Sequence, residues 1–227
     1  MKPIASILIP SRNRHTVLDG TIRSFLDTAS NSNEVEILVR LHHSDEDSVA
    51  WSKKCGLPAR FVIGDDALGY GSIDQFVNCL AAMSNGQWLF TWSDEHRMVT
   101  KGWDLILAEH DSNECHYFYA NMRQNPNWRV PILSRGLYHA IGHCGLTPRC
   151  DGYIDKLSGM AGISKRIAIE TDMVQLSCGV APNDGDENDR VTKSDYNVRR
   201  FDIDKIKLGA VLGRKLAPGN FPSGDWP

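Results

Sequence analysis

The feature that most constrains the fold is a regular alternation of short apolar runs and amphipathic segments over the first 92 residues. Four apolar runs have the length and composition of buried strands: Ala5–Pro10, Glu34–Leu41, Ala59–Ile63 and Gln87–Trp92. The segments between them carry apolar residues at helical spacing or helix start and stop signals: His15–Ala29, Ser44–Gly56 and Ser72–Asn85. Such an alternation predicts an α/β fold with a mostly parallel central sheet flanked by helices.

The second half of the chain is less regular. The patterns predict a helix over Gly102–His110, a strand over His116–Met122, and a strand followed by a helix within Val130–Gly142. We expect Asp151–Glu170 to be helical in part and Asp172–Val180 to form another strand. Residues 182–190 are acidic and contain glycine, which indicates a loop. Because no linker or repeat interrupts the chain, we predict a single domain over residues 1–227.

Composition narrows the class of protein. With 41% hydrophobic and 23% charged residues, the chain has the make-up of a soluble globular protein, and its net charge of −3 excludes a global basic surface for nucleic acid. The longest apolar stretches are far shorter than the roughly 18 residues of a membrane span, so we expect no span. The six cysteines form no C-x-x-C pair, and we expect reduced thiols in a cytoplasmic protein.

Polar residues follow the first strand at the point where a helix is expected to begin. The turn reads PSRNR, from Pro10 to Arg14, and brings Ser11, Arg12 and Arg14 together. A helix N-terminus supplies backbone N–H donors, and arginine binds phosphate through charge-assisted hydrogen bonds. The turn therefore predicts an anion site, with a solvated polar turn as the alternative.

A second polar turn, GDDALGYGS, precedes the third predicted helix. Gly69 and Gly71 allow a ligand to approach the backbone closely, although the turn lacks a complete phosphate-loop motif. Asn78 lies inside the helix, where asparagine is unfavourable, and this indicates a specific role. A flexible turn is the alternative interpretation.

Two adjacent carboxylates end the fourth strand, in the stretch QWLFTWSDEHR. Asp94 and Glu95 lie where parallel sheets bind their ligands, at the carboxyl end of a strand. Mg²⁺ and Mn²⁺ prefer oxygen ligands, usually one or two carboxylates with phosphate and water. The pair therefore predicts a metal site, and the alternative is a strand that becomes polar at the surface.

In their order and spacing, these pieces resemble a family 2 glycosyltransferase with the GT-A fold. SILIPSRNR is similar to the family's opening strand and turn, and EILVRLHHSDEDS to its second strand. LGYGSIDQFVNCLAAMSNGQWLFTWSDE is similar to the glycine turn, the Asn-bearing helix and the strand that leads into the D-x-D metal motif. The resemblance covers roughly residues 4 to 110.

The resemblance implies inverting, metal-dependent transfer of a hexose or pentose from a UDP- or GDP-sugar to an acceptor hydroxyl. Asp94 and Glu95 take the place of the D-x-D motif and imply Mn²⁺ or Mg²⁺ as cofactor. The implied donor-binding residues are Pro10, Ser11, Arg12, Arg14, His42, Asp65, Gly69, Asn78, Ser93 and Asp94. The implied catalytic base is Asp155 or Asp151, of which Asp155 fits the family position slightly better.

The resemblance also divides the chain into a nucleotide-sugar-binding half (residues 1–110), an acceptor and catalytic half (111–190) and a C-terminal extension (191–227). Two departures from the family pattern concern the donor site. Arg40-Leu41-His42-His43 stands where the family usually has an aspartate, and the metal motif is S-D-E instead of D-x-D. Where some members of the family have a downstream histidine as a third metal ligand, this chain offers Asp184 or Asp186. Trp103 is expected to pack in the core more readily than to stack on an acceptor.

Two other functions stay open at this point: a degenerate nucleotide-binding module without transferase activity, and a metal-dependent hydrolase or nucleotidyltransferase. The acceptor is also open, with a glycan and a hydroxylated base in DNA as the candidates. A local basic patch could serve DNA, although a solvated face is the favoured interpretation of these residues: Lys193, Arg199, Arg200, Lys205, Lys207, Arg214 and Lys215.

Overall fold

The structure is a computed structural model that describes residues 2–65, 72–125, 129–146, 150–174 and 195–216. Eight strands and seven α-helices are assigned in these ranges. The strands are β1 (Ala5–Ser11), β2 (Val35–His42), β3 (Arg60–Gly64), β4 (Trp88–Thr91), β5 (His96–Met98), β6 (Tyr117–Met122), β7 (Arg129–Ser134) and β8 (Ser164–Met173). The helices are α1 (His15–Thr28), α2 (Glu46–Ser52), α3 (Ile73–Met83), α4 (Trp103–Ala108), α5 (Arg135–Ile141), α6 (Cys150–Met160) and α8 (Asp195–Val211), with a 3-10 turn at Ser32–Glu34.

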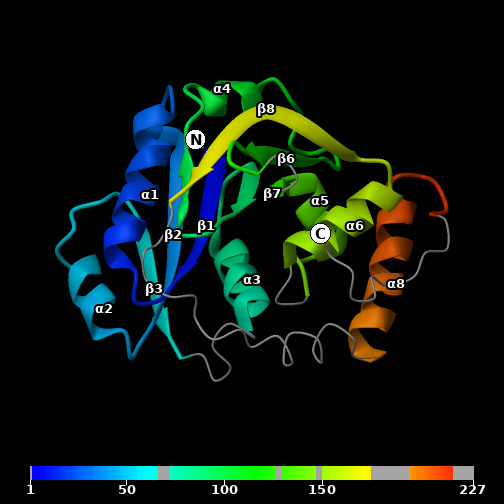
Figure 1. Ribbon diagram of the computed structural model, residues 1–227. Coiled ribbons are helices and arrows are strands. Elements are labelled where there is room, and N and C mark those ends of the chain that lie inside the picture. The colour runs from blue at the N-terminus through cyan, green and yellow to red at the C-terminus, as the bar shows by residue number, and fades with distance from the viewer. Residues whose placement is uncertain (1, 66–71, 126–128, 147–149, 175–194, 217–227) are drawn as a thin grey trace.

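All eight strands belong to one sheet, in the order β3-β2-β1-β4-β7-β6-β8-β5 (Figure 1). The first half of the chain supplies the parallel part, in which β1 pairs with both β2 and β4, and β2 pairs with β3. This confirms the predicted α/β class and its parallel core. Because β1, β2, β3 and β4 run in the same direction, their carboxyl ends lie along one edge of the sheet.

The second half extends the sheet with mixed pairing. β7 is antiparallel to β4 and to β6, whereas β8 runs parallel to β6. β8 is a long curved strand that passes across the sheet in Figure 1, and its far end pairs with β5. The sheet is therefore curled, and β5 brings the residues that follow Asp94 against the end of β8.

One sequence-based prediction in this region is confirmed, and another needs correction. The segment predicted as partly helical over Asp151–Glu170 is a helix only to Met160, and Ser164–Glu170 belongs to β8. The strand predicted at Asp172–Val180 is the end of β8, which begins eight residues earlier and ends at Met173; residues 175–180 lie outside the described residues. Along β8, Ile167, Ile169 and Thr171 are buried and alternate with exposed residues, as expected of a strand with one covered face.

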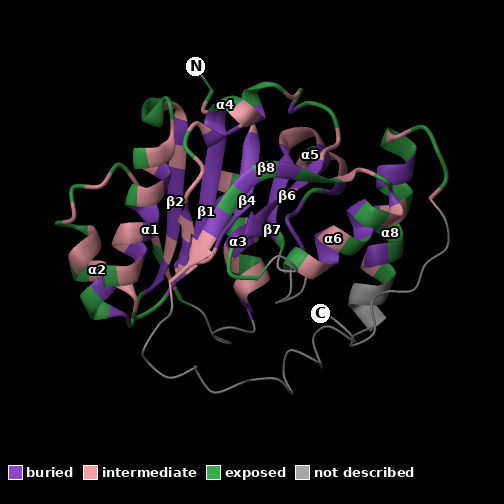
Figure 2. Ribbon diagram, turned by 45° about the horizontal axis from the view of Figure 1, so that its top comes forward, coloured by how far each residue is buried: buried purple, intermediate pink, exposed green. Residues whose placement is uncertain are grey.

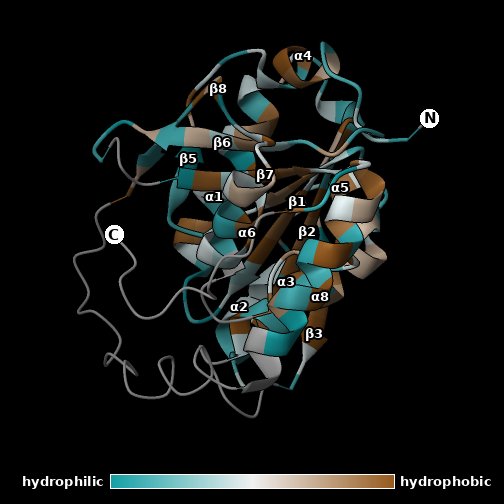
Figure 3. Ribbon diagram, turned by 90° about the vertical axis from the view of Figure 1, so that its right-hand side faces the viewer, coloured by the Kyte–Doolittle hydropathy of each residue, from teal (hydrophilic) through white to brown (hydrophobic). Residues whose placement is uncertain are grey.

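Helices cover both faces of the sheet, and each face has its own hydrophobic core (Figures 2 and 3). On one face α1 packs Leu18, Ile22 and Phe25 against the strands. Trp103 belongs to this core and is fully buried, which confirms the expected packing role. On the other face, α3, α5, α6 and α8 share the second core. In Figure 3 the hydrophobic strands β1 and β2 lie between these helical layers.

Local chemistry sets the helix ends close to the predicted positions. α2 begins after Asp45, whose carboxylate accepts a hydrogen bond from the Ser48 N–H, so Asp45 and not Ser44 caps this helix. α2 ends at Ser52, earlier than the glycine at position 56 that was expected to stop it. α5 has the Ser134 side chain as its N-cap and a left-handed Gly142 at its end.

Three of the late basic residues form ion pairs with acidic residues of their own helix. On α8, Arg200 and Lys207 form ion pairs with Asp204, and Lys205 pairs with Asp202. The predicted patch member Lys193 lies outside the described residues. Within the described ranges, every helix is too short or too polar to cross a bilayer.

Candidate functional site

The candidate site lies at the carboxyl ends of β1 and β4, which are neighbours in the sheet. The β1–β4 ladder runs to Leu8 and Thr91, and the Trp92 N–H continues it with a hydrogen bond of 3.0 Å to the Leu8 carbonyl. Beyond this point β1 turns into α1 through Ser11–Arg14, and β4 runs into the Ser93–His96 turn, where the His96 N–H donates to the Ser93 carbonyl. Two segments about 80 residues apart in sequence thus meet at one edge of the sheet.

Asp94 is the centre of this meeting point. Its residue exposure is 4%, and its Oδ2 accepts a hydrogen bond of 2.7 Å from the Ser11 hydroxyl. The guanidinium of Arg14 donates from Nη1 to Asp94 Oδ1 and to Glu95 Oε2, both at 3.3 Å. Two separately predicted motifs therefore form one cluster, which contains Ser11 and Arg14 from the first and Asp94 and Glu95 from the second.

Burial dominates the electrostatics of Asp94. Removal from water raises the pKa of its carboxyl, and the Ser11 hydrogen bond and the Arg14 charge oppose that rise. A buried carboxylate that keeps only partial compensation favours an added cation. Arg14 already bridges the two carboxylates with a positive charge, and in this respect its guanidinium stands in for a metal ion. The donor set of two carboxylates on a loop fits Mn²⁺ or Mg²⁺.

Two residues that the sequence did not single out fix the backbone of the Ser93–His96 turn. The Thr21 hydroxyl, on the buried side of α1, donates to the main-chain carbonyls of Asp94 and His96. Arg97 donates to the Asp94 and Val17 carbonyls and to the Thr21 hydroxyl. These bonds tie the turn to α1, so the direction of the Asp94 side chain is set by the packing of α1 on the sheet.

A third unpredicted residue, Asp45, shapes the Pro10–Arg14 turn. Asn13 has a left-handed backbone (φ 57°), and its N–H donates to Asp45 Oδ2. Although burial acts to raise the pKa of Asp45, its hydrogen bonds with Ser48 and Asn13 lower it below the usual value. An ionised Asp45 thus clamps the turn after β1 to the start of α2.

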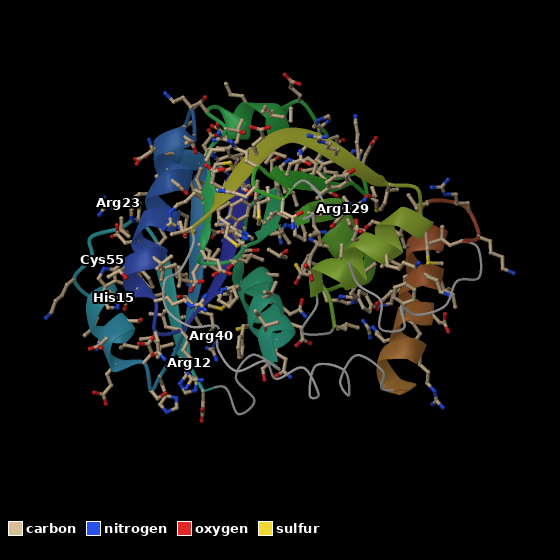
Figure 4. The ribbon with its side chains drawn as sticks, viewed as in Figure 1. Arg12, His15, Arg23, Arg40, Cys55 and Arg129 are labelled. Carbon is tan, nitrogen blue, oxygen red and sulfur yellow. The ribbon has the colours of Figure 1, made fainter. Side chains whose placement is uncertain are left out.

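The neighbouring strand ends bring four further residues to the same edge. Pro10 lies opposite Arg40 in the β1–β2 ladder, and His42 lies opposite Gly64, next to Asp65. Arg40 Nη2 donates to the Asp65 carbonyl at 3.3 Å. Figure 4 labels Arg12 and Arg40, which both lie at this edge, at the bottom of the view. Arginines and an acidic pair thus lie along one edge of the sheet, a combination whose chemistry suits phosphate groups and a divalent cation.

The other predicted donor-site residues fall in different surroundings. Ser93 is half-buried in the turn, and its hydroxyl accepts a hydrogen bond from the Glu95 N–H. Asn78 uses both ends of its amide on the loop after α5, since its Nδ2 donates to the Gly145 carbonyl and its Oδ1 accepts from the Cys144 N–H, each at 2.7 Å. Gly69 lies outside the described residues, as do Asp184 and Asp186.

The two candidate bases lie on α6 in different environments. Both carboxylate oxygens of Asp155 accept hydrogen bonds from Arg129 Nη1, at 2.8 and 2.9 Å, and the Arg129 guanidinium also lies over the Tyr119 ring. Asp151 lies in the first turn of α6 and is exposed. In Figures 1 and 2, the amino-terminal end of α6 points toward α3, and both helices belong to the same core. Asp151 is therefore at the end of α6 nearer to α3.

A search against protein-family models finds no match, and no curated protein matches in sequence. Solved structures do match. One is the mannosyltransferase PcManGT from Pyrobaculum calidifontis in complex with GDP-Man and Mn²⁺, with a TM-score of 0.59, 10% identity, and coverage of 94% of this chain and 75% of that one. Another is S. aureus TarS 1–349 in complex with UDP, with a TM-score of 0.58, 12% identity, and coverage of 93% and 71%. At this identity the likeness establishes the fold, and the chain has the GT-A-like α/β fold of these proteins.

Proposed function

We propose that this chain is an inverting, metal-dependent glycosyltransferase that moves a sugar from a UDP- or GDP-sugar to an acceptor hydroxyl. The observation that carries the proposal is the convergence of Ser11 and Arg14 with Asp94 and Glu95 at the ends of β1 and β4. The fold supports it, because PcManGT was solved with GDP-Man and Mn²⁺ and TarS 1–349 with UDP.

In this proposal Asp94 and Glu95 hold Mn²⁺ or Mg²⁺. When bound, the cation stabilises the charge that develops on the departing diphosphate, an effect worth several kcal/mol. Ser11 orients the Asp94 carboxylate through its 2.7 Å hydrogen bond. Arg14, whose side chain is 36% exposed, is free to exchange its carboxylate partners for phosphate oxygens, and Arg12 adds a second positive charge.

The remaining half of the reaction needs a base that takes the proton of the acceptor hydroxyl. We assign this role to Asp151 in preference to Asp155. Asp151 is exposed in the first turn of α6, whereas the side chain of Asp155, one turn further along, is 30% exposed. Residues 1–110 form the donor half in this scheme, and residues 111–190 contain the base.

Product analysis tests the proposal and separates it from its two rivals. The protein is incubated with Mn²⁺ and a panel of UDP- and GDP-sugars, together with glycans and hydroxymethylated DNA, and acceptors are examined by mass spectrometry. We expect an acceptor that gains the mass of a hexose or pentose. Free sugar without any acceptor product would indicate a hydrolase. Binding of the nucleotide without turnover would indicate a binding module.

Two matched variants, Asp151→Asn and Asp155→Asn, test which aspartate is the base. Asp151→Asn should lower kcat by roughly 100-fold or more while the affinity for the nucleotide and Mn²⁺ stays unchanged. Asp155→Asn should leave kcat within a few-fold of the wild type and weaken mainly the packing of Arg129. The opposite pattern would transfer the role to Asp155.

A further inference from the structure

Three side chains at the carboxyl ends of β2 and β3 place metal-binding atoms close together, on different strands from the acidic pair that follows β4. They are His42 and His43, from the end of β2, and Asp65, directly after β3. Among the residues that the structure describes, this is the one group of three or more His, Cys, Asp or Glu side chains with a donor atom each inside 4.8 Å. We propose that His42, His43 and Asp65 form a binding site for a Zn²⁺-type cation, separate from Asp94 and Glu95.

The backbone explains why these side chains meet. His42 lies opposite Gly64 in the parallel β2–β3 ladder, and the His43 N–H donates to the Gly64 carbonyl at 2.9 Å. Successive strand residues normally point to opposite faces, but β2 ends at His42 and the chain turns there, with the Asp45 N–H bonded to the His42 carbonyl. The two imidazole rings consequently lie 4.6 Å apart between centroids, at an angle of 33°.

The distances are those of ligands around a shared ion. His42 Nε2 lies 3.6 Å and His43 Nδ1 3.5 Å from the same atom, Asp65 Oδ1. These separations exceed the roughly 2.7–3.2 Å of a hydrogen bond between nitrogen and oxygen. A tetrahedral Zn²⁺ with bonds of about 2.0–2.1 Å separates its ligand atoms by roughly 3.4 Å. The two separations from Asp65 Oδ1 are therefore close to the ligand spacing of a tetrahedral site, and all three donor atoms lie within 4.8 Å of one another.

The ligand types select a different metal from the one expected at Asp94. Imidazole nitrogen suits Zn²⁺, Co²⁺, Ni²⁺ and Cu²⁺, whereas carboxylate, phosphate and water suit Mg²⁺ and Mn²⁺. Two histidines and one aspartate also leave a coordination position for water, as in three-ligand zinc sites. The two cation sites are thus chemically distinct, and each can be titrated with its own metal.

A hydrogen bond behind His42 supports its role as a ligand. Its Nδ1 lies 2.6 Å from the Ser44 hydroxyl and 3.1 Å from the Ser44 N–H. When Nε2 binds a metal, Nδ1 carries the proton and donates it to the hydroxyl, which fixes the ring as outer partners of zinc-bound histidines do. The hydrogen bond from the Ser44 N–H needs an unprotonated Nδ1. Metal binding at Nε2 therefore replaces this bond with one from the protonated Nδ1 to the Ser44 hydroxyl.

One residue of the cluster separates this inference from the proposed transferase. His42 and Asp65 belong to the predicted donor site, whereas His43 does not. Its side chain is 56% exposed, so its removal leaves the core intact. The variant His43→Ala therefore removes one of three metal ligands without altering a residue assigned to donor binding.

Titration with Co²⁺, followed by competition with Zn²⁺, tests the site without any activity assay. Tetrahedral Co²⁺ absorbs in the visible range, and binding through thiolate adds a charge-transfer band in the near ultraviolet that marks cysteine ligands. We expect the wild type to bind Co²⁺ with tetrahedral bands and no thiolate band, and Zn²⁺ to displace it. The affinity should fall by more than about tenfold in His43→Ala and stay unchanged in Asp94→Ala.

Two results would overturn the inference: no tetrahedral Co²⁺ spectrum in the wild type, or equal Co²⁺ affinity in the wild type and His43→Ala. Nucleotide binding in the presence of Mn²⁺ is measured on the same samples. His43→Ala should keep it and Asp94→Ala should lose it. Failure of the transferase proposal, which appears as absent nucleotide binding, is therefore distinguishable from failure of the zinc site.

Discussion

His96, the residue that follows the acidic pair, should make the stability of this protein depend on pH below neutrality. The residue is 5% exposed, and its ring lies edge-on to Trp92 with centroids 5.9 Å apart. Burial, with a smaller contribution from the positive charge of Arg97, lowers its pKa from 6.5 to about 4. The folded protein thus keeps this imidazole neutral at a pH where the unfolded chain protonates it.

The sign and size of the effect follow from linkage. Because the folded pKa is the lower one, the stabilising contribution is complete above pH 6.5 and is lost as the pH falls toward 4. Between pH 7 and pH 5 the free energy of unfolding should decrease by about 2 kcal/mol through this residue alone. Since His96 begins β5, the loss also loosens the turn that carries Asp94.

Urea unfolding at pH 7 and pH 5 measures the effect. His96→Gln should lower stability at pH 7, but its stability should fall by about 2 kcal/mol less than that of the wild type between the two pH values. His139→Gln serves as the control, because His139 is exposed on α5 and its removal should leave the wild-type pH dependence in place. Equal pH dependence in the wild type and His96→Gln would refute the reasoning.

Three further predictions concern charge, a buried network and a close backbone contact. Arg14→Gln should bind Mn²⁺ alone about fivefold more tightly by calorimetry, the equivalent of ~1 kcal/mol, and nucleoside diphosphates more weakly; unchanged values would show that Arg14 does not compete for the carboxylates. Tyr153→Phe removes the 2.7 Å hydrogen bond to the fully buried Asp204 on α8. The free energy of unfolding in urea should fall by about 1–3 kcal/mol. A change near zero would show that this hydrogen bond does not help to hold α8 on the core. Gly86→Ala places a Cβ 2.4 Å from the backbone of Ser6 and should destabilise the protein by about 1–3 kcal/mol, which lowers its melting temperature. The control Gly159→Ala, in open space on α6, should raise stability by about 0.5–1 kcal/mol. Similar effects of the two substitutions would contradict the packing at Gly86.

The first half of the fold was predictable because each of its helices and strands has a recognisable pattern within its own residues. Strand and helix periods alternate there without interruption, and parallel strands bring their carboxyl ends to one edge. That rule alone predicts that Ser11 and Arg14, after β1, lie near Asp94 and Glu95, after β4. The structure confirms the cluster and adds the bridging position of Arg14.

The second half was harder because its strands are defined by distant partners. β5 has only three residues, and its partner in β8 lies more than 70 residues away. The alternation of Ile167, Ile169 and Thr171 was the one local signal of β8, and the helical pattern before it obscured where the helix ended. Ion pairs between distant segments, such as Asp155 with Arg129, cannot be predicted from the sequence pattern of either segment.

Calorimetric titration of UDP and GDP, with and without Mn²⁺, tests the central claim most directly. The account predicts that one of the two nucleotides binds the wild type, that binding requires Mn²⁺, and that Asp94→Ala abolishes it, while Asp111→Ala, at an acidic residue after α4, retains it. Binding of neither nucleotide, or binding that is equally strong without Mn²⁺ and in Asp94→Ala, would contradict the account and leave Asp94 and Glu95 as a polar strand end.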